Sequence, residues 1–527
     1  KQEGEEELTL QDLPKEVLEG LDPKQRSVLE LVLKRQNVLV TGGAGVGKTF
    51  ISERITQALR VKFKERFYES VAVTATTGTA AVMTGGCTLH SLAGTGVPRV
   101  LKDFKKLRCG IRGKIWKDLQ VLIIDEVSML SGEFFDLLEA EVRSLRTEDS
   151  IHPAAPFGGL QVILIGDFFQ LPPVEDQVDI TRIDVDLWRD SNRAVLRSNS
   201  KRKQRKDKVV LKYECFLNRG MVFQGDAFWD LRLGVVELTT NYRQRKDREF
   251  RDCLNSLRGG RNVWKSVRKL NEQCYRPLPG DSDDAIILFP INRKAEDENS
   301  RRLAEIPAEE RSFKAMDTTK VHMDEIDSNK NGTSIELTEM DKRNILAEFC
   351  ADGLKEFGVG ETVTLKVGAR VMLTANVNIR NGLINGAMGV VRCFSRSQKV
   401  EVQFDNDRAG YRWVEPYEFK SRIPGIGTII RKQLPLRLAW AITHHKSQGK
   451  TLERVRVDPG AFCDGQAYVA LSRARHANGL ELLAPISARK VLVNKDAETF
   501  MKALRNESRA REELGTWRQT KPKLRRR

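Results

Sequence analysis

The feature that most constrains this chain is the glycine-rich sequence GGAGVGKT at residues 42–49. It follows an apolar, strand-like run at Val38–Val40 and precedes a stretch with helical spacing. Glycines let the backbone curl so that successive N–H groups point at one phosphate, and the dipole of the following helix favours the same negative charge. The motif therefore predicts a phosphate-binding loop between a strand and a helix, as α/β folds provide.

Three further apolar segments predict strands of the same sheet. VAVTAT at 71–76, VLIID at 121–125 and QVILIGD at 161–167 are rich in β-branched residues and lack the polar alternation of a half-exposed strand. Helical patterns lie between them, as at Phe134–Arg146, and a helical pattern with N-cap chemistry opens at Asp22. Strands alternating with helices predict a doubly wound, mostly parallel sheet.

Composition narrows the class of protein. A chain of 527 residues predicts three or four domains. Its net charge of +17 favours a polyanionic partner, with an ordinary basic surface as the alternative. The eight cysteines form no CxxC pair, which argues against a zinc ribbon or a disulfide framework and for a reducing compartment. No apolar run approaches the roughly 20 residues of a membrane span, so we expect none.

Polar residues next to these strands predict chemistry on a nucleotide. Lys48 is expected to reach the β- and γ-phosphates, and the Thr49 hydroxyl to bind Mg²⁺. Asp125 and Glu126 end a strand near the phosphate loop, so we assign Asp125 to the metal and Glu126 to the general base. Gln170 follows another strand at the same edge, where it can sense the γ-phosphate or be a simple loop amide.

Two other segments allow several interpretations. The basic run KRKQRKDK at 201–208 is a solvated loop, a nucleic-acid contact or a nuclear-import signal. DSNKNG at 327–332 resembles the start of an EF-hand calcium loop. The twelfth position is Thr338, with Glu339 one place late, which predicts a polar surface loop instead.

Long strings in this sequence resemble the Pif (petite integration frequency) family of superfamily 1 helicases, in the 5′-to-3′ branch. The most specific string is PFGGLQVILIGDFFQLPPV at 156–174. The resemblance extends from about Leu21 to Leu482. Further strings agree in order, at residues 73–96, 238–244, 382–391, 436–452 and 465–475.

The resemblance implies a domain organisation with two RecA-like α/β units. Short strands with glycine turns between Val363 and Phe404 independently predict a small β-barrel. The expected parts are an acidic, frayed N-terminal segment at 1–20; a first RecA-like domain at 21–235 with a basic insertion at about 175–211; a second RecA-like domain at 236–311 and 433–493; an inserted linker and SH3-like barrel at 312–432; and a basic C-terminal tail at 494–527.

The resemblance also implies a nucleotide site shared by both units. Gln25 would read adenine and Tyr242 would stack on it. Arg243 and Arg473 would be arginine fingers on the γ-phosphate, although for either arginine alone a surface ion pair is the commoner explanation. The expected ATP-binding set is Gln25, Gly42, Gly43, Ala44, Gly45, Val46, Gly47, Lys48, Thr49 and Tyr242.

DNA contacts follow from the same resemblance. Small hydroxyl and imidazole donors suit a motor that holds phosphates without selecting bases. The expected contacts are Thr74, Thr77, His90, Ser91, His445, Lys446 and Ser447. Two residues depart from the family pattern, since His444 occupies an expected apolar position and Lys450 adds a charge beside the site. The length of the basic insertion leaves the strand-separating residue unassigned.

The sequence therefore predicts an ATP- and Mg²⁺-dependent 5′-to-3′ DNA helicase that moves on single-stranded DNA and unwinds duplexes. We expect a monomer in genome maintenance, nuclear or mitochondrial if the source is eukaryotic. A RecD-like nuclease subunit and a relaxase-linked helicase are disfavoured, because the sequence shows no nuclease carboxylate cluster or relaxase histidine triad. An RNA helicase and a nonenzymatic, nucleotide-gated DNA clamp stay open.

Overall fold

The computed structural model describes a defined set of residues. They are 8–77, 80–81, 84, 86–96, 98, 101–147, 155–174, 216, 218–279, 285–321, 340, 359–375, 377–378, 381–383, 387–405, 410–423 and 427–514. The basic insertion, the calcium-loop-like sequence and the last part of the basic C-terminal tail, from residue 515 on, lie outside them. Among the described helices, none combines the length and apolar character needed to cross a bilayer.

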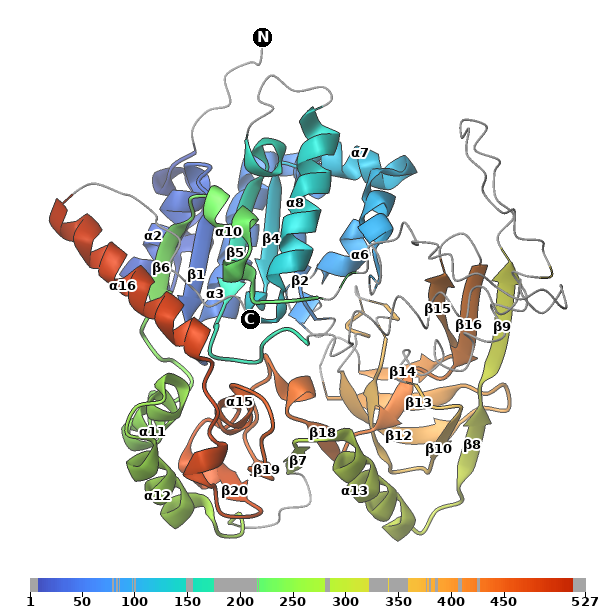
Figure 1. Ribbon diagram of the computed structural model, residues 1–527. Coiled ribbons are helices and arrows are strands. Elements are labelled where there is room, and N and C mark those ends of the chain that lie inside the picture. Colours follow the sequence, from blue (N-terminus) through green and yellow to red (C-terminus); the bar gives the residue numbers. More distant parts are fainter. Residues whose placement is uncertain are drawn as a thin grey trace, which may run out of the picture.

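The first sheet has six parallel strands in the order β3-β2-β4-β5-β1-β6 (Figure 1). The prediction of a parallel sheet is confirmed, and each strand expected from the sequence is present. The strands are β1 (Val38–Gly42), β2 (Val71–Ala75), β3 (Cys87–Thr88), β4 (Val121–Asp125), β5 (Gln161–Gly166) and β6 (Gly234–Leu238).

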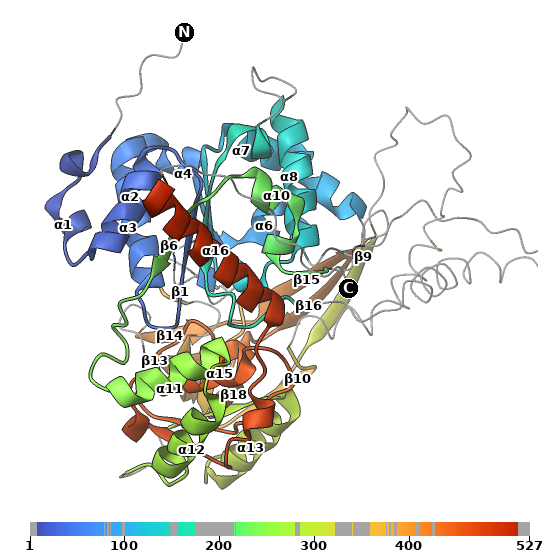
Figure 2. The same ribbon diagram turned by 60° about the vertical axis from the view of Figure 1, so that its left-hand side comes forward.

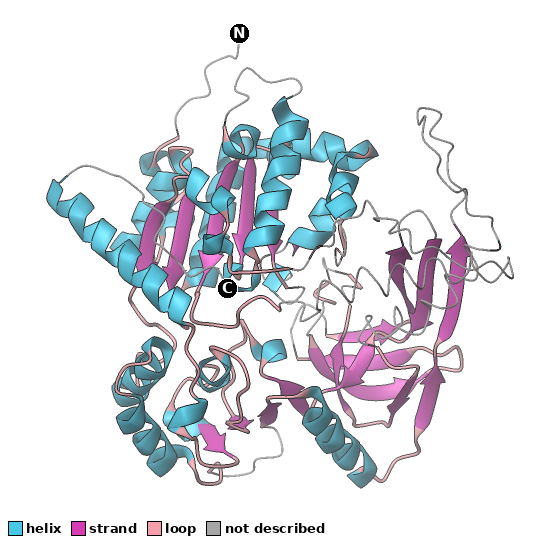
Figure 3. Ribbon diagram, viewed as in Figure 1, coloured by secondary structure: helices cyan, strands magenta, loops and turns pink. Residues whose placement is uncertain are grey.

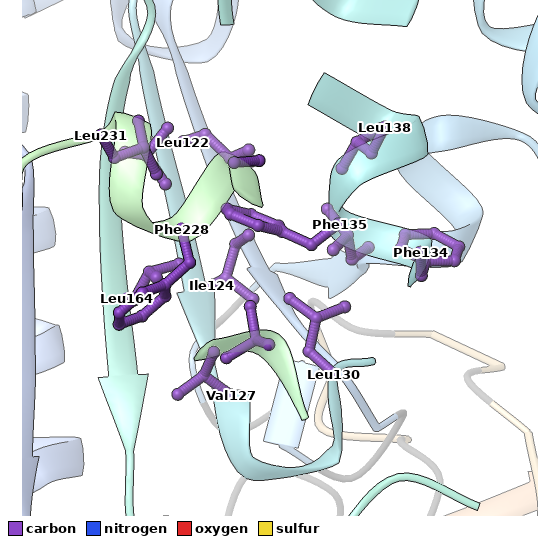
Figure 4. Close-up of a cluster of buried hydrophobic side chains, with 14 of the residues drawn as sticks. Leu122, Ile124, Val127, Leu130, Phe134, Phe135, Leu138, Leu164, Phe228 and Leu231 are labelled. Atoms are coloured by element: carbon purple, nitrogen blue, oxygen red, sulfur yellow. The ribbon is translucent and has the colours of Figure 1, made fainter. Parts of the chain in front are cut away.

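Helices cover both faces of this sheet, which explains why its strands are apolar throughout. Leu122 and Ile124 of β4 face one core, and the alternating Val121 and Ile123 face the other. Figure 4 shows Leu122, Ile124 and Leu164 among side chains of α8 and α10. The helices here are α1 (Lys15–Leu18), α2 (Pro23–Leu33), α3 (Lys48–Phe63), α4 (Phe67–Ser70), α6 (Leu89–Ala93), α7 (Gly110–Asp118), α8 (Gly132–Thr147) and α10 (Asp226–Asp230).

A second parallel sheet of four strands lies below the first in Figure 1, in the order β18-β7-β19-β20. Together the two sheets give a mixed α/β architecture that fits a RecA-like core. The strands are β7 (Ile286–Phe289), β18 (Ala441–Thr443), β19 (Val455–Val457) and β20 (Leu480–Leu482). The helices are α11 (Arg248–Gly259), α12 (Val263–Cys274), α13 (Asn292–Glu305) and α15 (Gln466–Leu471).

The remaining strands are antiparallel and gather on one side of the molecule (Figure 3). A five-stranded sheet has the order β14-β13-β12-β11-β17; β15-β16-β9 and β10-β8 form smaller sheets. β17 was expected to open the second α/β segment but pairs with β11 instead, so the parallel sheet resumes only at β18. The strands are β8 (Arg311–Lys314), β9 (Met316–Val321), β10 (Thr362–Leu365), β11 (Arg370–Leu373), β12 (Met388–Phe394), β13 (Val400–Phe404), β14 (Tyr411–Val414), β15 (Tyr417–Ile423), β16 (Gly427–Gln433) and β17 (Leu436–Leu438).

The two ends of the described chain differ from expectation. Leu13 and Val17, in the segment expected to be frayed, are buried in the α2–α3 core. The expected tail begins with a long helix, α16 (Lys495–Leu514), that crosses the first sheet (Figure 2). Its buried residues recur at helical spacing, which is why it packs as an amphipathic helix. They are Ala497, Phe500, Met501 and Leu504.

Candidate active site

The phosphate loop joins β1 to α3, as the sequence predicts. Gly45 and Gly47 have φ angles of 77° and 85°, in the left-handed region that favours glycine. A Cβ at Gly45 would lie 2.5 Å from the Cβ of Arg243, so a side chain there would collide with the segment after β6. The loop therefore needs glycine for both its curvature and its close approach to Arg243.

Lys48 is the first residue of α3, and its ammonium lies inside the curl of the loop. Its Nζ donates to the carbonyls of Gly42 and Gly43, each at 2.8 Å. Burial lowers the pKa of Lys48, opposed by the nearby carboxylates of Asp167 and Glu126. An anion bound in the loop would stabilise this buried cation, because it adds opposite charge where water is excluded.

Two carboxylates lie at the end of β4. Asp125 and Glu126 are both buried, and the Glu126 N–H donates to Asp125 Oδ1 at 2.7 Å. Burial, and then the charge of Glu126, raise the pKa of Asp125. This pair fits a divalent cation, since such an ion keeps neighbouring carboxylates ionised. Among the described residues, no group of three or more histidine, cysteine or acidic side chains is placed to hold a metal ion.

Gln170 follows β5 and faces the same region. Its Oε1 is buried with no hydrogen-bond partner, and its Nε2 lies 3.5 Å from Asp167 Oδ2. A buried amide oxygen without a partner is uncommon and is expected where a ligand or water completes the site. Gln170 therefore has a free acceptor at the edge of the sheet where the sequence predicts a phosphate sensor.

The predicted adenine-binding residues lie together beside Gly47. A Cβ at Gly47 would be 2.8 Å from Gln25 Nε2 and 3.5 Å from the ring of Tyr242. Asp22 joins them: it forms a capping box with Gln25 at the start of α2, and it accepts a hydrogen bond from the Tyr242 hydroxyl at 2.9 Å. Gln25 Nε2 is buried without a partner, whereas Tyr242 is 40% exposed. The free Gln25 amide can donate a hydrogen bond to the edge of a base, and the exposed Tyr242 ring can stack on its face.

The two predicted arginine fingers meet where the sheets adjoin. Arg243 follows β6 and donates from Nη1 to the Ser472 carbonyl at 2.9 Å. Arg473 follows α15 and is 1% exposed. Its shortest hydrogen bonds are to the Val469 carbonyl at 2.7 Å and the Ser472 hydroxyl at 2.9 Å.

Hydrogen bonds to neutral acceptors offset only part of the free-energy cost of burying a charged guanidinium. Burial lowers the pKa of Arg473, and the charge of Glu126 opposes this effect. Burial, and then the charge of Arg473, likewise lower the pKa of Arg243. For Arg473 the burial excludes the alternative of a surface ion pair. Two buried cations at one junction favour an anionic ligand between the sheets.

Three contributors were missed by the sequence reasoning. Asp167 is fully buried after β5 and accepts hydrogen bonds from Arg258 of α11, at 2.7 Å from Nη2 and 3.0 Å from Nε. The Tyr468 hydroxyl of α15 accepts a hydrogen bond from the Ala44 N–H at 2.7 Å. Asp167 stands in the quoted GDFFQ string and could have been named. Tyr468 likewise lies in the matching string at 465–475, whereas Arg258 lies in none of the matching strings; only the tertiary fold shows that both reach the loop.

The predicted DNA contacts of the first sheet divide into two groups. Thr74 is fully buried and its hydroxyl donates to the Ile123 carbonyl at 2.6 Å, within the sheet. Thr77 accepts from the Ala80 N–H at 3.2 Å, and Ser91 is exposed on α6. The His90 ring lies 4.4 Å from the Phe134 ring, and burial lowers its pKa to about 4. His90 is therefore a neutral donor at physiological pH.

The corresponding contacts of the second sheet lie on a 3₁₀ turn, η7 (His445–Ser447). The His445 ring is stacked 6.2 Å from the ring of Phe462, which is 61% exposed. Burial, and then Arg437, lower the pKa of Lys446 to about 8. Ser447 is fully buried, and its hydroxyl donates to the His444 carbonyl at 2.7 Å.

His444 itself explains one departure from the family pattern. It is fully buried, and burial lowers its pKa to about 4. The imidazole is therefore neutral at physiological pH, so it fills the expected apolar position without burying a charge.

Comparison with known proteins gives one consistent family. A family model described as PIF1-like helicase matches residues 20–214, and a model of the DNA helicase Pif1 2B domain matches residues 357–394. The curated ATP-dependent DNA helicase PIF1 of Xenopus laevis is 33% identical over 477 residues, covering 89% of this chain and 62% of that protein. The Danio rerio protein is 33% identical, covering 93% and 65%. The chain thus spans less than two thirds of the length of these relatives.

Solved structures agree over nearly the whole chain. The crystal structure of Pif1 helicase from Candida albicans is 29% identical with a TM-score of 0.70, covering 92% of this chain and 99% of that one. Pif1 helicase from Bacteroides, in complex with ADP-AlF3 and ssDNA, is 26% identical with a TM-score of 0.64, covering 94% and 98%. The similarity therefore includes both parallel sheets and the antiparallel strands.

Proposed function

We propose that this chain belongs to the family of PIF1-like helicases and that it is an ATP-dependent 5′-to-3′ DNA helicase that moves on single-stranded DNA and unwinds duplexes. One observation carries the proposal. Arg243 and the buried Arg473 meet the phosphate loop and the carboxylates of β4 at the junction of the two parallel sheets. A nucleotide bound there would hold the two sheets together, and its hydrolysis would release them.

ATP would bind with its phosphates in the loop and its base beside Gly47. The loop residues 42–49 supply N–H donors, and Lys48 supplies the positive charge. Gln25 Nε2 is the free donor for the edge of adenine, and the exposed Tyr242 ring is the stacking surface. Mg²⁺ would be held by the Thr49 hydroxyl and Asp125, and it supplies charge neutralisation on the β- and γ-phosphates.

Hydrolysis follows from the groups around the γ-phosphate. Glu126 takes a proton from water as the water oxygen attacks the γ-phosphorus, the bond to the bridging β–γ oxygen breaks, and ADP leaves. Arg243 and Arg473 stabilise the charge that spreads over the γ-phosphoryl oxygens, and Gln170 orients the water or the phosphate. Both arginines would reach the γ-phosphate best when the two sheets move toward each other. ATP turnover would therefore be coupled to this movement.

Single-stranded DNA would run across both sheets. Thr77, His90 and Ser91 would contact its phosphates from the first sheet, and His445 and Lys446 from η7. Neutral donors hold the backbone without selecting a sequence. If the two sets of contacts hold the DNA alternately as the sheets separate and approach, the protein would move along the strand in one direction. The family supplies the 5′-to-3′ direction.

We further propose two RecA-like domains, at 21–235 and at 236–311 with 433–493. The inserted part at 312–432 is proposed to contain an SH3-like barrel, supported by the five-stranded antiparallel sheet. The chain would act as a monomer, since one chain supplies both sides of the nucleotide cleft. Genome maintenance in the nucleus or mitochondrion is the role that family membership suggests.

The test combines ATPase and unwinding. Steady-state ATPase is measured with and without single-stranded DNA, and unwinding is measured on two partial duplexes, one with a 5′ tail and one with a 3′ tail. We expect DNA-stimulated turnover and unwinding of the 5′-tailed substrate alone. A nonenzymatic clamp predicts ATP-dependent DNA binding without turnover, and preference for an RNA strand would favour an RNA helicase.

A further inference from the structure

We propose that Gln448 is a positioning residue that holds the general base Glu126 and makes its position depend on DNA bound at η7. The inference rests on the proposed function and deepens it. Gln448 Nε2 donates to Glu126 Oε2 at 3.1 Å, and both side chains are buried. The two residues are 322 positions apart in sequence: Glu126 follows β4 of the first parallel sheet, and Gln448 follows β18 of the second. This hydrogen bond therefore crosses the junction and reaches the proposed base directly.

Gln448 is tied to the proposed DNA-binding turn by its backbone. It is the C-cap of η7, and its N–H donates to the His445 carbonyl at 3.2 Å. Arg473 extends the same connection, because its Nη1 donates to the carbonyl of Lys450 at 3.3 Å. A shift of η7 would therefore move both the hydrogen bond to Glu126 and the contacts of an arginine finger.

Glu126 is also held from the first sheet. The Thr76 hydroxyl donates to the Glu126 carbonyl at 2.8 Å, and the Thr76 N–H donates to the Asp125 carbonyl at 3.2 Å. Thr76 directly precedes Thr77, a proposed DNA contact. Glu126 has a φ angle of 53°, a left-handed conformation that a non-glycine residue keeps only when its surroundings hold it. Glu126 is thus hydrogen-bonded by Thr76 and by Gln448, and each of these residues is adjacent in sequence to a proposed DNA-contacting segment.

Hydrogen bonding to one carboxylate oxygen has a definite consequence for catalysis. A general base must lie within hydrogen-bond reach of the water that it deprotonates, so a small displacement slows the step. The amide of Gln448 fixes one oxygen of Glu126 and leaves the other for water. DNA that orders η7 would order this amide, and hydrolysis would accelerate when DNA is bound. Coupling of this kind works in both directions, so the nucleotide state should alter DNA affinity.

The test uses Gln448→Met in the full chain, because methionine keeps the length of the side chain and removes the donor. We measure kcat and KM for ATP with and without saturating oligo(dT), and Kd for the oligonucleotide. The DNA-stimulated kcat should fall at least about tenfold and the basal kcat by less, so that the ratio of stimulated to basal turnover falls, while KM and Kd stay within about twofold. Gln433→Met is the matched control: Gln433 is a buried glutamine of β16 that donates to backbone carbonyls in the antiparallel strands. It should keep the wild-type ratio of stimulated to basal turnover.

Each outcome supports or overturns a distinct statement. A wild-type protein without DNA-stimulated ATPase overturns the proposed function itself. A stimulated wild type with an unchanged ratio in Gln448→Met overturns only the role of Gln448, as does an equal fall in basal and stimulated turnover. Should Gln448→Met fail to fold in a thermal melt, Gln448→Leu replaces it, since it also lacks the donor and adds no charge beside Glu126. The positioning role predicts that the Leu variant loses its stimulation, and a wild-type ratio of stimulated to basal turnover would overturn that role.

Discussion

Replacing Arg258 with methionine tests the contact that joins the two parallel sheets behind the nucleotide site. Arg258 of α11 and Asp167 after β5 have side chains that are 11% and 0% exposed, with N–O distances of 2.7, 3.0 and 3.1 Å. The Arg258→Met variant leaves a fully buried carboxylate without its partner. Breaking one side of such a buried pair destabilises a protein by about 3–5 kcal/mol.

The assay is thermal unfolding at neutral pH. One kcal/mol corresponds to roughly 2–4 °C for a unit of 150–250 residues, so the midpoint should fall by at least about 6 °C. Adding Asp167→Asn removes the orphaned charge and should restore most of the loss. The control is Arg268→Met, which removes an exposed i,i+4 ion pair with Glu272 on α12 and should melt like the wild type.

Lowering the pH should reduce the loss of thermal stability that Arg258→Met causes. Burial raises the pKa of Asp167, but Arg258 and Lys48 outweigh it and hold that pKa below its usual value. In the wild type this pairing stabilises the fold above the pKa of the unfolded state, and the stabilisation is lost as pH falls through the folded pKa. Without Arg258 the folded pKa rises, so protonation relieves the unpaired charge. A midpoint within about 2 °C of the wild type at neutral pH would refute the reasoning.

Three further predictions concern single residues. Lys48→Ala should abolish DNA-stimulated ATPase and leave single-strand binding largely intact in a filter-binding assay; turnover above about a tenth of wild type would exclude the phosphate-loop assignment. Glu126→Gln should bind ATP and Mg²⁺ but hydrolyse ATP at least about a hundredfold more slowly in single-turnover measurements, and a milder Asp125→Asn variant would reverse the two roles. Phe500→Ala removes a fully buried ring stacked 4.3 Å from Phe223, so chemical denaturation should show a loss of about 3–5 kcal/mol, and a near-neutral result would show that α16 is dispensable.

The local sequence was sufficient to predict the main strands of the first sheet and the phosphate loop. The segments 38–40, 71–76, 121–125 and 161–167 are apolar on both faces because helices cover both faces, and this pattern is visible without a structure. The same holds for the phosphate loop, whose glycines are required by backbone angles that few other residues adopt.

Contacts between distant segments could not be predicted in this way. Tyr468 and Gln448 lie in matching strings and Arg258 in none, but no string indicates a partner, and the partners of all three follow strands of the first sheet. The burial of Thr74 and Ser447, two of the predicted DNA contacts, was likewise not visible in the sequence. A threonine or serine in a matching string gives no indication that its hydroxyl is used by a neighbouring carbonyl.

The C-terminal helix was missed for a different reason. Its charged composition suggested a basic tail, and the apolar positions at 497, 500, 501 and 504 were overlooked within it. Their helical spacing could have predicted an amphipathic helix. The sheet that it covers could not have been predicted, because packing against β6 and α10 depends on the course of the whole chain.

The central claim is that ATP is hydrolysed between the two parallel sheets, with Arg473 acting across the junction. The most direct measurement is steady-state ATPase of Arg473→Ala with saturating single-stranded DNA, on protein whose thermal melt matches that of the wild type. The account predicts a fall in kcat of about a thousandfold with a much smaller change in ATP affinity, and little rescue by Arg473→Lys, because an ammonium lacks the planar fork. A kcat within about threefold of wild type would contradict catalysis across the junction.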